Sequence, residues 1–106
     1  MKKEELQEKF SEILKVLSLL QDEADTFDFL RDLLSEKEIL EFSRRFEVAK
    51  MLQNKVSYTD IEKKTGMSST TIARIGKFLN GENQGYQKAL SCLKSITYRH
   101  QEGNHF

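Results

Sequence analysis

The chain has 106 residues, of which 38% are hydrophobic and 32% charged, and its formal net charge is zero. This length fits one domain spanning residues 1–106, and the composition is typical of a globular chain rather than a disordered one. The longest apolar stretch, near Val16–Leu20, is too short to cross a bilayer. With no apolar signal region after Met1 and a single Cys92, we expect a cytoplasmic protein without an internal disulfide.

Charge is distributed unevenly along the chain. Net charge is −5 over residues 1–40, +4 over residues 41–80 and +1 over residues 81–106. A basic middle segment weakly indicates a polyanionic partner. Ordinary solvated helix faces explain the same charges equally well.

The first predicted helix covers about residues 3–20. Its apolar residues are spaced by 4, 3, 4 and 3 positions, which is coiled-coil spacing; they are Leu6, Phe10, Ile13, Leu17 and Leu20. A long helix with one narrow apolar stripe needs a partner. In so short a chain, that partner can be a second subunit.

An acidic connection at Gln21–Asp25 and a short helix ending near Leu34 come next. Ser35 and Glu38 then have the spacing of a capping box, which predicts a helix over residues 36–53. Its expected inner face carries residues three or four apart, flanked by Leu40 and Met51; they are Ile39, Phe42, Phe46, Ala49 and Leu52.

Two short helices follow, over residues 58–64 and 69–79, and they begin after the helix-capping residues Ser57 and Ser68. A loop at residues 80–85 leads to a last helix over about residues 86–98, and we expect the tail 100–106 to be disordered.

Residues 57–79 have the pattern of a helix-turn-helix, which is two short helices joined by a turn that contains glycine. Gly66 lies in the turn, where we expect a positive φ. Four apolar positions close a small core: Ile61, Met67, Ile72 and Ile75. The other side of the second helix carries small, polar or basic residues, which suits entry into the DNA major groove. A plain helical hairpin with residues Ser68–Thr71 acting only as caps is the alternative.

Two consecutive stretches of the chain resemble the Trp repressor family. The first runs from Leu33-Leu34-Ser35 through Arg44-Arg45 to Leu52, and the second contains Ser57, Ile61, Thr65-Gly66 and Thr71-Ile72-Ala73-Arg74. Together they are most similar to the Gram-positive branch of Trp-repressor-related proteins. The similarity is detailed over residues 33–80. It implies an all-α, six-helix fold, an intertwined homodimer, and a transcriptional regulator, most simply a repressor, that binds double-stranded DNA at a two-fold symmetric operator.

The resemblance also assigns residues to DNA. Ser69, Thr70 and Thr71 match the family's base-reading positions, and Thr59 and Glu62 fall where the family has basic residues near phosphates. Because Glu62 would repel phosphate, the footprint is expected to differ, with nearby cations as substitutes. The candidate DNA-binding residues are Thr59, Lys63, Lys64, Ser68, Ser69, Thr70, Thr71, Arg74 and Lys77.

In the family, two arginines hold the tryptophan corepressor, and Arg45 and Arg74 occupy the matching positions. They fit a carboxylate-bearing effector, since arginine binds carboxylates bidentately. The family's repressors have a glycine after the second arginine and a small serine three residues later. Here Ile75 and Phe78 stand in those places, so we expect them to fill the tryptophan slot and complete a core. In the alternative interpretation, Arg44 and Arg45 pair with acids such as Glu41 or contact phosphate.

No pattern in the sequence indicates an enzyme, a metal site or a cofactor. His100 and His105 are too few for a structural zinc site, which takes about four ligands. Two other functions stay open: a helical dimerisation or protein-interaction module that has lost specific DNA binding, and a repressor switched by another small carboxylate. The operator, the regulated genes and the direction of regulation do not follow from the sequence.

Overall fold

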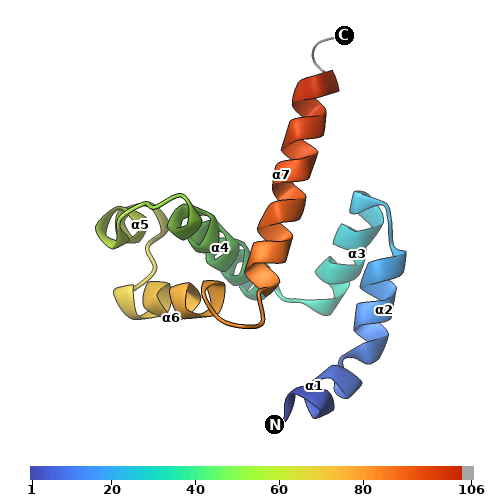
Figure 1. Ribbon diagram of the computed structural model, residues 1–106. Helices are drawn as coiled ribbons and strands as arrows, with labels where there is room; N and C mark the ends of the chain where they lie inside the picture. Colours follow the sequence, from blue (N-terminus) through green and yellow to red (C-terminus); the bar gives the residue numbers. More distant parts are fainter. Residues whose placement is uncertain (104–106) are drawn as a thin grey trace. The chain divides into compact units, whose positions relative to one another are not determined.

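The computed structural model describes the backbone of residues 1–103 and the side chains of residues 1–96, and within that range the chain is entirely helical. Seven helices follow one another in this described part (Figure 1): α1 (Lys3–Lys9), α2 (Ser11–Leu19), α3 (Glu23–Leu33), α4 (Glu36–Gln53), α5 (Tyr58–Thr65), α6 (Ser69–Leu79) and α7 (Gly85–Gly103). The chain divides into two compact units, Met1–Ile39 and Leu40–Phe106. None of the described helices is long and apolar enough to cross a membrane.

The expected six-helix layout is wrong by one helix, because the first predicted helix is divided at Phe10. Phe10 has φ −97° and ψ 0°, which lies between the regular helical and extended regions. The hydrogen bonds continue across it, from Phe10 N–H to the Leu6 carbonyl and from Leu14 N–H to the Phe10 carbonyl, at 3.1 and 3.0 Å. The division is therefore a bend in a nearly continuous helical path.

The predicted acidic connection at residues 21–25 is also wrong, since α3 begins at Glu23. Asp22 is the N-cap, and its side chain accepts a hydrogen bond from Ala24 N–H at 2.8 Å. Glu23 and Asp25 lie in the first turn, where negative charge is favourable beside unpaired backbone N–H groups. The acids that look like a linker are thus the start signal of the helix.

Unit 1 has no buried core of its own. None of its residues is buried, and several large apolar side chains are highly exposed, among them Leu6 at 58% and Leu19 at 78%. Three short helices with apolar faces and no buried residue do not carry their own hydrophobic stabilisation.

Helix α4 begins and ends with well-defined caps. The predicted capping box is confirmed, because Ser35 N–H donates to Glu38 Oε1 at 2.9 Å and Glu38 N–H donates to Ser35 Oγ at 3.2 Å. At the other end, Val56 N–H bonds the Met51 carbonyl and Lys55 N–H bonds the Leu52 carbonyl, at 3.0 and 3.1 Å. This is the Schellman pattern of helix termination, with Lys55 in the left-handed position at φ 65°.

The core of unit 2 joins α4, α5, α6 and α7. Its buried members are Val48, Ala49, Met51, Ile61, Ile72, Ile75, Leu79 and Leu90. The predicted inner face of α4 is therefore only partly right: Ala49 is buried and Phe46 and Leu52 pack against the core, but Phe42 is 48% exposed. The buried residues of the helix, Val48, Ala49 and Met51, all lie in its C-terminal half.

Helix α7 is longer than predicted. It runs from Gly85 to Gly103 instead of ending near Tyr98, so residues 100–103 of the tail expected to be disordered are helical. Residues 86–102 contain neither glycine nor proline, and without such a breaker the helix continues until Gly103. The last part of that prediction, residues 104–106, lies outside the described residues.

Candidate nucleic-acid interface

Helices α5 and α6 form the two short helices joined by a turn that the sequence predicts (Figure 1). Ser57 caps α5 by accepting a hydrogen bond from Asp60 N–H at 3.3 Å. Gly66 ends α5 with φ 74°, as expected for a glycine whose turn needs a positive φ. In the turn, the Thr65 hydroxyl donates to the Ile61 carbonyl at 2.7 Å and accepts from Met67 N–H at 3.2 Å. These bonds fix where α6 starts.

One face of α6 holds the helix in the core. Ile72, Ile75, Gly76 and Leu79 are buried, and they follow the spacing of a single helix face. Ile61 is fully buried opposite them, and Met67 packs against the same cluster. The predicted small core between the two helices is confirmed, with Gly76 and Leu79 as members that the sequence analysis missed although their spacing from Ile72 indicates them.

The opposite face of α6 is exposed and carries two positive charges. Thr70, Arg74 and Lys77 are separated by four and three positions, so they share one side of the helix, away from the buried side. Within the described part of the chain, none of these three side chains makes a hydrogen bond or an ion pair. Ser69 is also exposed, at the start of the helix.

Ser68 and Thr71 differ from their neighbours because their hydroxyls already have partners. Ser68 Oγ accepts a hydrogen bond from Thr71 N–H at 3.3 Å and lies 3.1 Å from Thr71 Oγ1. Thr71 is also half-buried. The hydroxyl run thus divides into a cap, Ser68 and Thr71, and two accessible residues, Ser69 and Thr70.

Helix α5 exposes the remaining predicted contact residues. Thr59, Lys63 and Lys64 are exposed, and the two lysines lie in the last turn of the helix. Glu62 is exposed as well, so it points outward and the α5–α6 pair keeps its packing. Its charge lies on the same short helix as the cations, which lowers the positive potential there.

The two arginines of the predicted effector site are engaged differently. Arg45 Nη2 lies 2.7 Å from Glu41 Oε1, and its guanidinium lies 5.9 Å from the centre of the Phe42 ring. This contact is the carboxylate pairing that the alternative interpretation describes. Arg74 is exposed and unpaired within the described residues, and no contact there links it to Arg45.

The expectation that Ile75 and Phe78 together complete a core is half wrong. Ile75 is 3% exposed and belongs to the core, but Phe78 is 62% exposed. The Phe78 ring lies on the outer side of α6 and lines an open pocket of about 330 Å³ with Phe46 and Tyr86. Residue 78 follows Ile75 by almost one turn, and the core at that level is completed by Leu79 instead.

No cluster of side chains in the described part of the chain has the composition to hold a metal ion. Glu38 belongs to the α4 capping box, where the hydrogen bonds from Ser35 N–H and Ser35 Oγ lower the pKa of its carboxyl. The exposed side chains of α5 and α6 include hydroxyls and cations, which bind base edges and phosphates, together with the carboxylates of Asp60 and Glu62.

Comparison with known proteins identifies relatives that match most of this chain. Residues 8–94 match the family model of the Trp repressor protein. The uncharacterised protein YerC of Bacillus subtilis strain 168 is 38% identical over 90 residues, which cover 85% of this chain and 83% of YerC.

Two crystal structures share the fold. A TrpR-like protein from Eubacterium eligens ATCC 27750 is 38% identical, with a TM-score of 0.76 over 82% of this chain and 90% of that one. A candidate Trp repressor from Staphylococcus aureus is 29% identical, with a TM-score of 0.79 over 89% of this chain and 95% of that one. Because the family model covers most of both units and these relatives match over most of their length, the chain belongs to the Trp repressor family, whose members are non-enzymatic regulators.

Proposed function

We propose that this protein is a cytoplasmic, sequence-specific DNA-binding regulator, most simply a repressor, that binds a two-fold symmetric operator as a homodimer. Family membership suggests a DNA-binding regulator. The observation that carries the finer proposal is the exposed face of α6. Its residues Thr70, Arg74 and Lys77 have no partners among the described side chains, and they lie opposite four buried residues.

This face has the composition of a recognition helix. Thr70 offers a hydroxyl and a methyl group to a base edge, and Arg74 offers a fork of donors that pairs with guanine. Lys77, one turn further along, and Lys63 and Lys64 on α5 supply charge for phosphates. Ser69 and Thr59 lie at the starts of their helices, where small polar groups can approach the backbone of DNA.

The homodimer is proposed from the apolar surface of unit 1. Its side chains gain hydrophobic stabilisation only when a further surface covers them, and fully covering one leucine contributes about 1.5–3 kcal/mol. A second copy of the chain supplies that surface and a second α6, and the two helices would then lie about one DNA turn apart, at ~34 Å.

The proposed regulator does not respond to tryptophan. Ile75 is packed into the core at the position where the family's tryptophan-binding members have a glycine. Arg45 is already paired with Glu41. A ligand at that place would have to displace a buried side chain and break an ion pair, so isothermal calorimetry with tryptophan is expected to show no binding heat.

DNA binding is tested by selecting bound sequences from a random duplex pool and then measuring affinity by fluorescence anisotropy. We expect a palindromic consensus. Thr70→Ala and Arg74→Ala should each weaken specific binding by roughly 1–3 kcal/mol if the side chain touches a base edge. Lys88→Ala is the matched control, because Lys88 is an exposed cation on α7, and it should leave the affinity unchanged.

An unenriched pool, or equal losses for Arg74→Ala and Lys88→Ala, would refute the proposal and favour a protein-interaction module. The dimer is tested separately by sedimentation equilibrium. Leu6→Asp should dissociate it, whereas Gln7→Asp introduces the same charge at an exposed polar neighbour and should not. If both variants sediment like the wild type, unit 1 does not form the dimer contact.

A further inference from the structure

The end of α6 carries a chemically reactive pair of residues. Asn80 is the C-cap of α6 and Gly81 follows it, and no other asparagine of the sequence precedes a glycine. In such a pair the glycine nitrogen can attack the side-chain amide carbon of the asparagine. The two groups belong to one short stretch of chain, and glycine has no side chain to hinder the approach. The pair is therefore a candidate site of deamidation.

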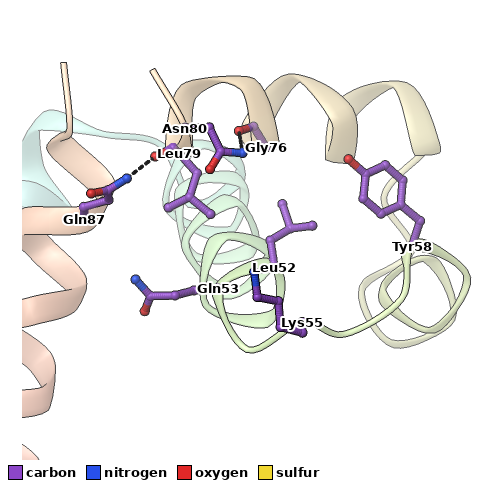
Figure 2. A pocket seen from close by; sticks show the side chains of 8 residues that line it. All are labelled: Leu52, Gln53, Lys55, Tyr58, Gly76, Leu79, Asn80 and Gln87. Atoms are coloured by element: carbon purple, nitrogen blue, oxygen red, sulfur yellow. Dashed lines mark hydrogen bonds between the residues drawn. The ribbon is translucent and has the colours of Figure 1, made fainter. Parts of the chain in front are cut away.

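The reaction needs only water. The Gly81 nitrogen loses its proton and bonds to Asn80 Cγ, the Cγ–Nδ2 bond breaks, and ammonia leaves with the released proton. Water then opens the resulting succinimide ring at either carbonyl. The product is aspartate at position 80 or its isomer, in which the main chain runs through the side-chain carbon. Asn80 is exposed and lines a second open pocket of about 330 Å³, so water reaches it (Figure 2).

The folded conformation holds the two reacting groups apart. Asn80 has ψ 3°, so the Gly81 nitrogen eclipses the Asn80 nitrogen, whereas ring closure requires it to eclipse Asn80 Cβ. Gly81 N–H donates to the Phe78 carbonyl at 3.2 Å. Asn80 Nδ2 donates to the Gly76 carbonyl at 3.0 Å (Figure 2). Rotation about ψ breaks the first bond and rotation of the side chain breaks the second, so the reaction waits for both to open.

Helix α7 closes the same end of α6. Gln87 Nε2 donates to the Leu79 carbonyl at 2.6 Å (Figure 2). Leu79 is buried in the core and directly precedes Asn80. Helix ends open locally at a small cost in free energy, and the bond from Gln87 raises that cost for the last turn of α6.

Packing explains why a glycine follows Asn80. A Cβ at position 81 would lie 3.2 Å from the Lys77 carbonyl oxygen and 3.5 Å from the Phe78 carbonyl oxygen. A side chain at this position would therefore crowd the backbone at the end of α6. The same glycine leaves its own nitrogen least hindered for the attack, so the tight end of α6 creates the reactive pair.

We propose that Asn80 is a deamidation site whose rate is set by opening of the last turn of α6. The new carboxylate weakens this turn, because the Nδ2 donor to the Gly76 carbonyl is lost and negative charge is unfavourable at the C-terminal end of a helix. Lys77 lies three positions before Asn80, and residues three apart are neighbours on a helix surface. The carboxylate thus also lowers the positive potential of the exposed face of α6. Only an effect on DNA affinity rests on the proposed function.

The reaction is measured by incubating the protein in mildly alkaline buffer and following the exchange of –NH₂ for –OH by mass spectrometry of the chain and its peptides. Two hydrogen bonds must open first, so we expect residue 80 to react at least about tenfold more slowly in the native protein than in denaturing urea, a difference of ~1.4 kcal/mol. Asn80→Gln should abolish the signal.

A variant on α7 tests the control by local opening. Gln87→Ala leaves the reactive pair intact but removes the bond to the Leu79 carbonyl, and it should speed the native reaction by about threefold. Lys88→Ala changes the neighbouring exposed residue and should leave the rate unchanged. In urea all of these chains should react at the wild-type rate, because no folded turn is left to protect Asn80.

The consequence of the reaction is tested with Asn80→Asp, which imitates one product, and Asn80→Ala, which loses the same hydrogen bond without adding charge. Asn80→Asp should melt below the wild type and bind the operator at least about twofold more weakly than Asn80→Ala, with a difference that shrinks at high salt. If no operator exists, the proposed function fails while the reaction rates still stand. The inference is overturned if Asn80 reacts equally fast in native protein and in urea, if Gln87→Ala leaves the native rate unchanged, or if Asn80→Asp melts at or above the wild type.

Discussion

The two glycines of the helix-turn-helix should respond to the same substitution with opposite signs. At Gly66, φ is 74° and an added Cβ meets no atom within 4 Å, so Gly66→Ala introduces no clash. Its cost is only that of a left-handed L-residue, roughly 1–2 kcal/mol. At Gly76, a helical position, Ala makes ordinary contacts at 3.4 and 3.7 Å and gains the helix preference, about 0.5–1 kcal/mol.

Urea denaturation followed by circular dichroism measures both effects at one protein concentration. We expect Gly66→Ala to lower the free energy of unfolding and Gly76→Ala to raise it. Gly66→Asn should cost less than Gly66→Ala, because asparagine adopts positive φ more readily. The reasoning is refuted if Gly66→Asn costs as much as Gly66→Ala, or if Gly66→Ala costs well over 3 kcal/mol, since a steric clash would then be the cause.

Three further predictions concern the caps and the cations. Ser57→Ala and Ser68→Ala should each lower the free energy of unfolding by about 1 kcal/mol, measured by urea denaturation, and neither loss should be rescued by salt. Hydrogen bonds from Ser35 lower the pKa of Glu38. The Glu38 carboxylate therefore contributes to the free energy of unfolding above its unfolded-state pKa, and this contribution is lost as pH falls through its folded-state pKa. Glu38→Gln should flatten that part of the curve of stability against pH. Lys77→Ala should reduce the slope of log affinity against log salt concentration by about 1; an unchanged slope would remove Lys77 from the interface.

The helix boundaries that sequence predicts best are those set by local hydrogen bonds. Ser35, Ser57 and Ser68 cap their helices as expected, and Gly66 has the positive φ assigned to it. Each of these signals acts over three or four residues, so no tertiary information is needed to interpret it. The same logic applies to Asp22, whose capping signal lies inside a run of acids that composition alone describes as a linker.

The predictions that fail are those that depend on what lies across from a helix face. Phe42 and Phe78 are apolar residues at helical spacing, and both are exposed. Spacing gives the side of a helix but not how far along the helix its packing partner extends. The bend at Phe10 is not predicted either, since residues 6–20 contain no glycine or proline to indicate it.

The sequence predicts the DNA-binding residues as one set, but the structure separates those whose hydroxyls are bonded within the chain from those whose hydroxyls are accessible. Ser68 and Thr71 bond each other and the start of α6, so removing them alters stability before any question of DNA arises. Sequence cannot separate these from Ser69 and Thr70, because all four are small hydroxyl residues at a helix start.

The exposed face of the proposed recognition helix, α6, can change without disturbing the fold. On the exposed face of α6, Thr70, Arg74 and Lys77 have no partner within the described part of the chain. The position of the helix is fixed by the buried residues of its other face, which are Ile72, Ile75, Gly76 and Leu79. Substitutions on the exposed face should therefore change the free energy of unfolding by no more than about 0.5 kcal/mol. DNA preference can then diverge among relatives that keep the fold, as the TM-scores of 0.76 and 0.79 at 38% and 29% identity allow. A residue that contacts DNA directly is one whose substitution changes operator affinity but not stability. A residue that positions α6 is one whose substitution changes both affinity and stability.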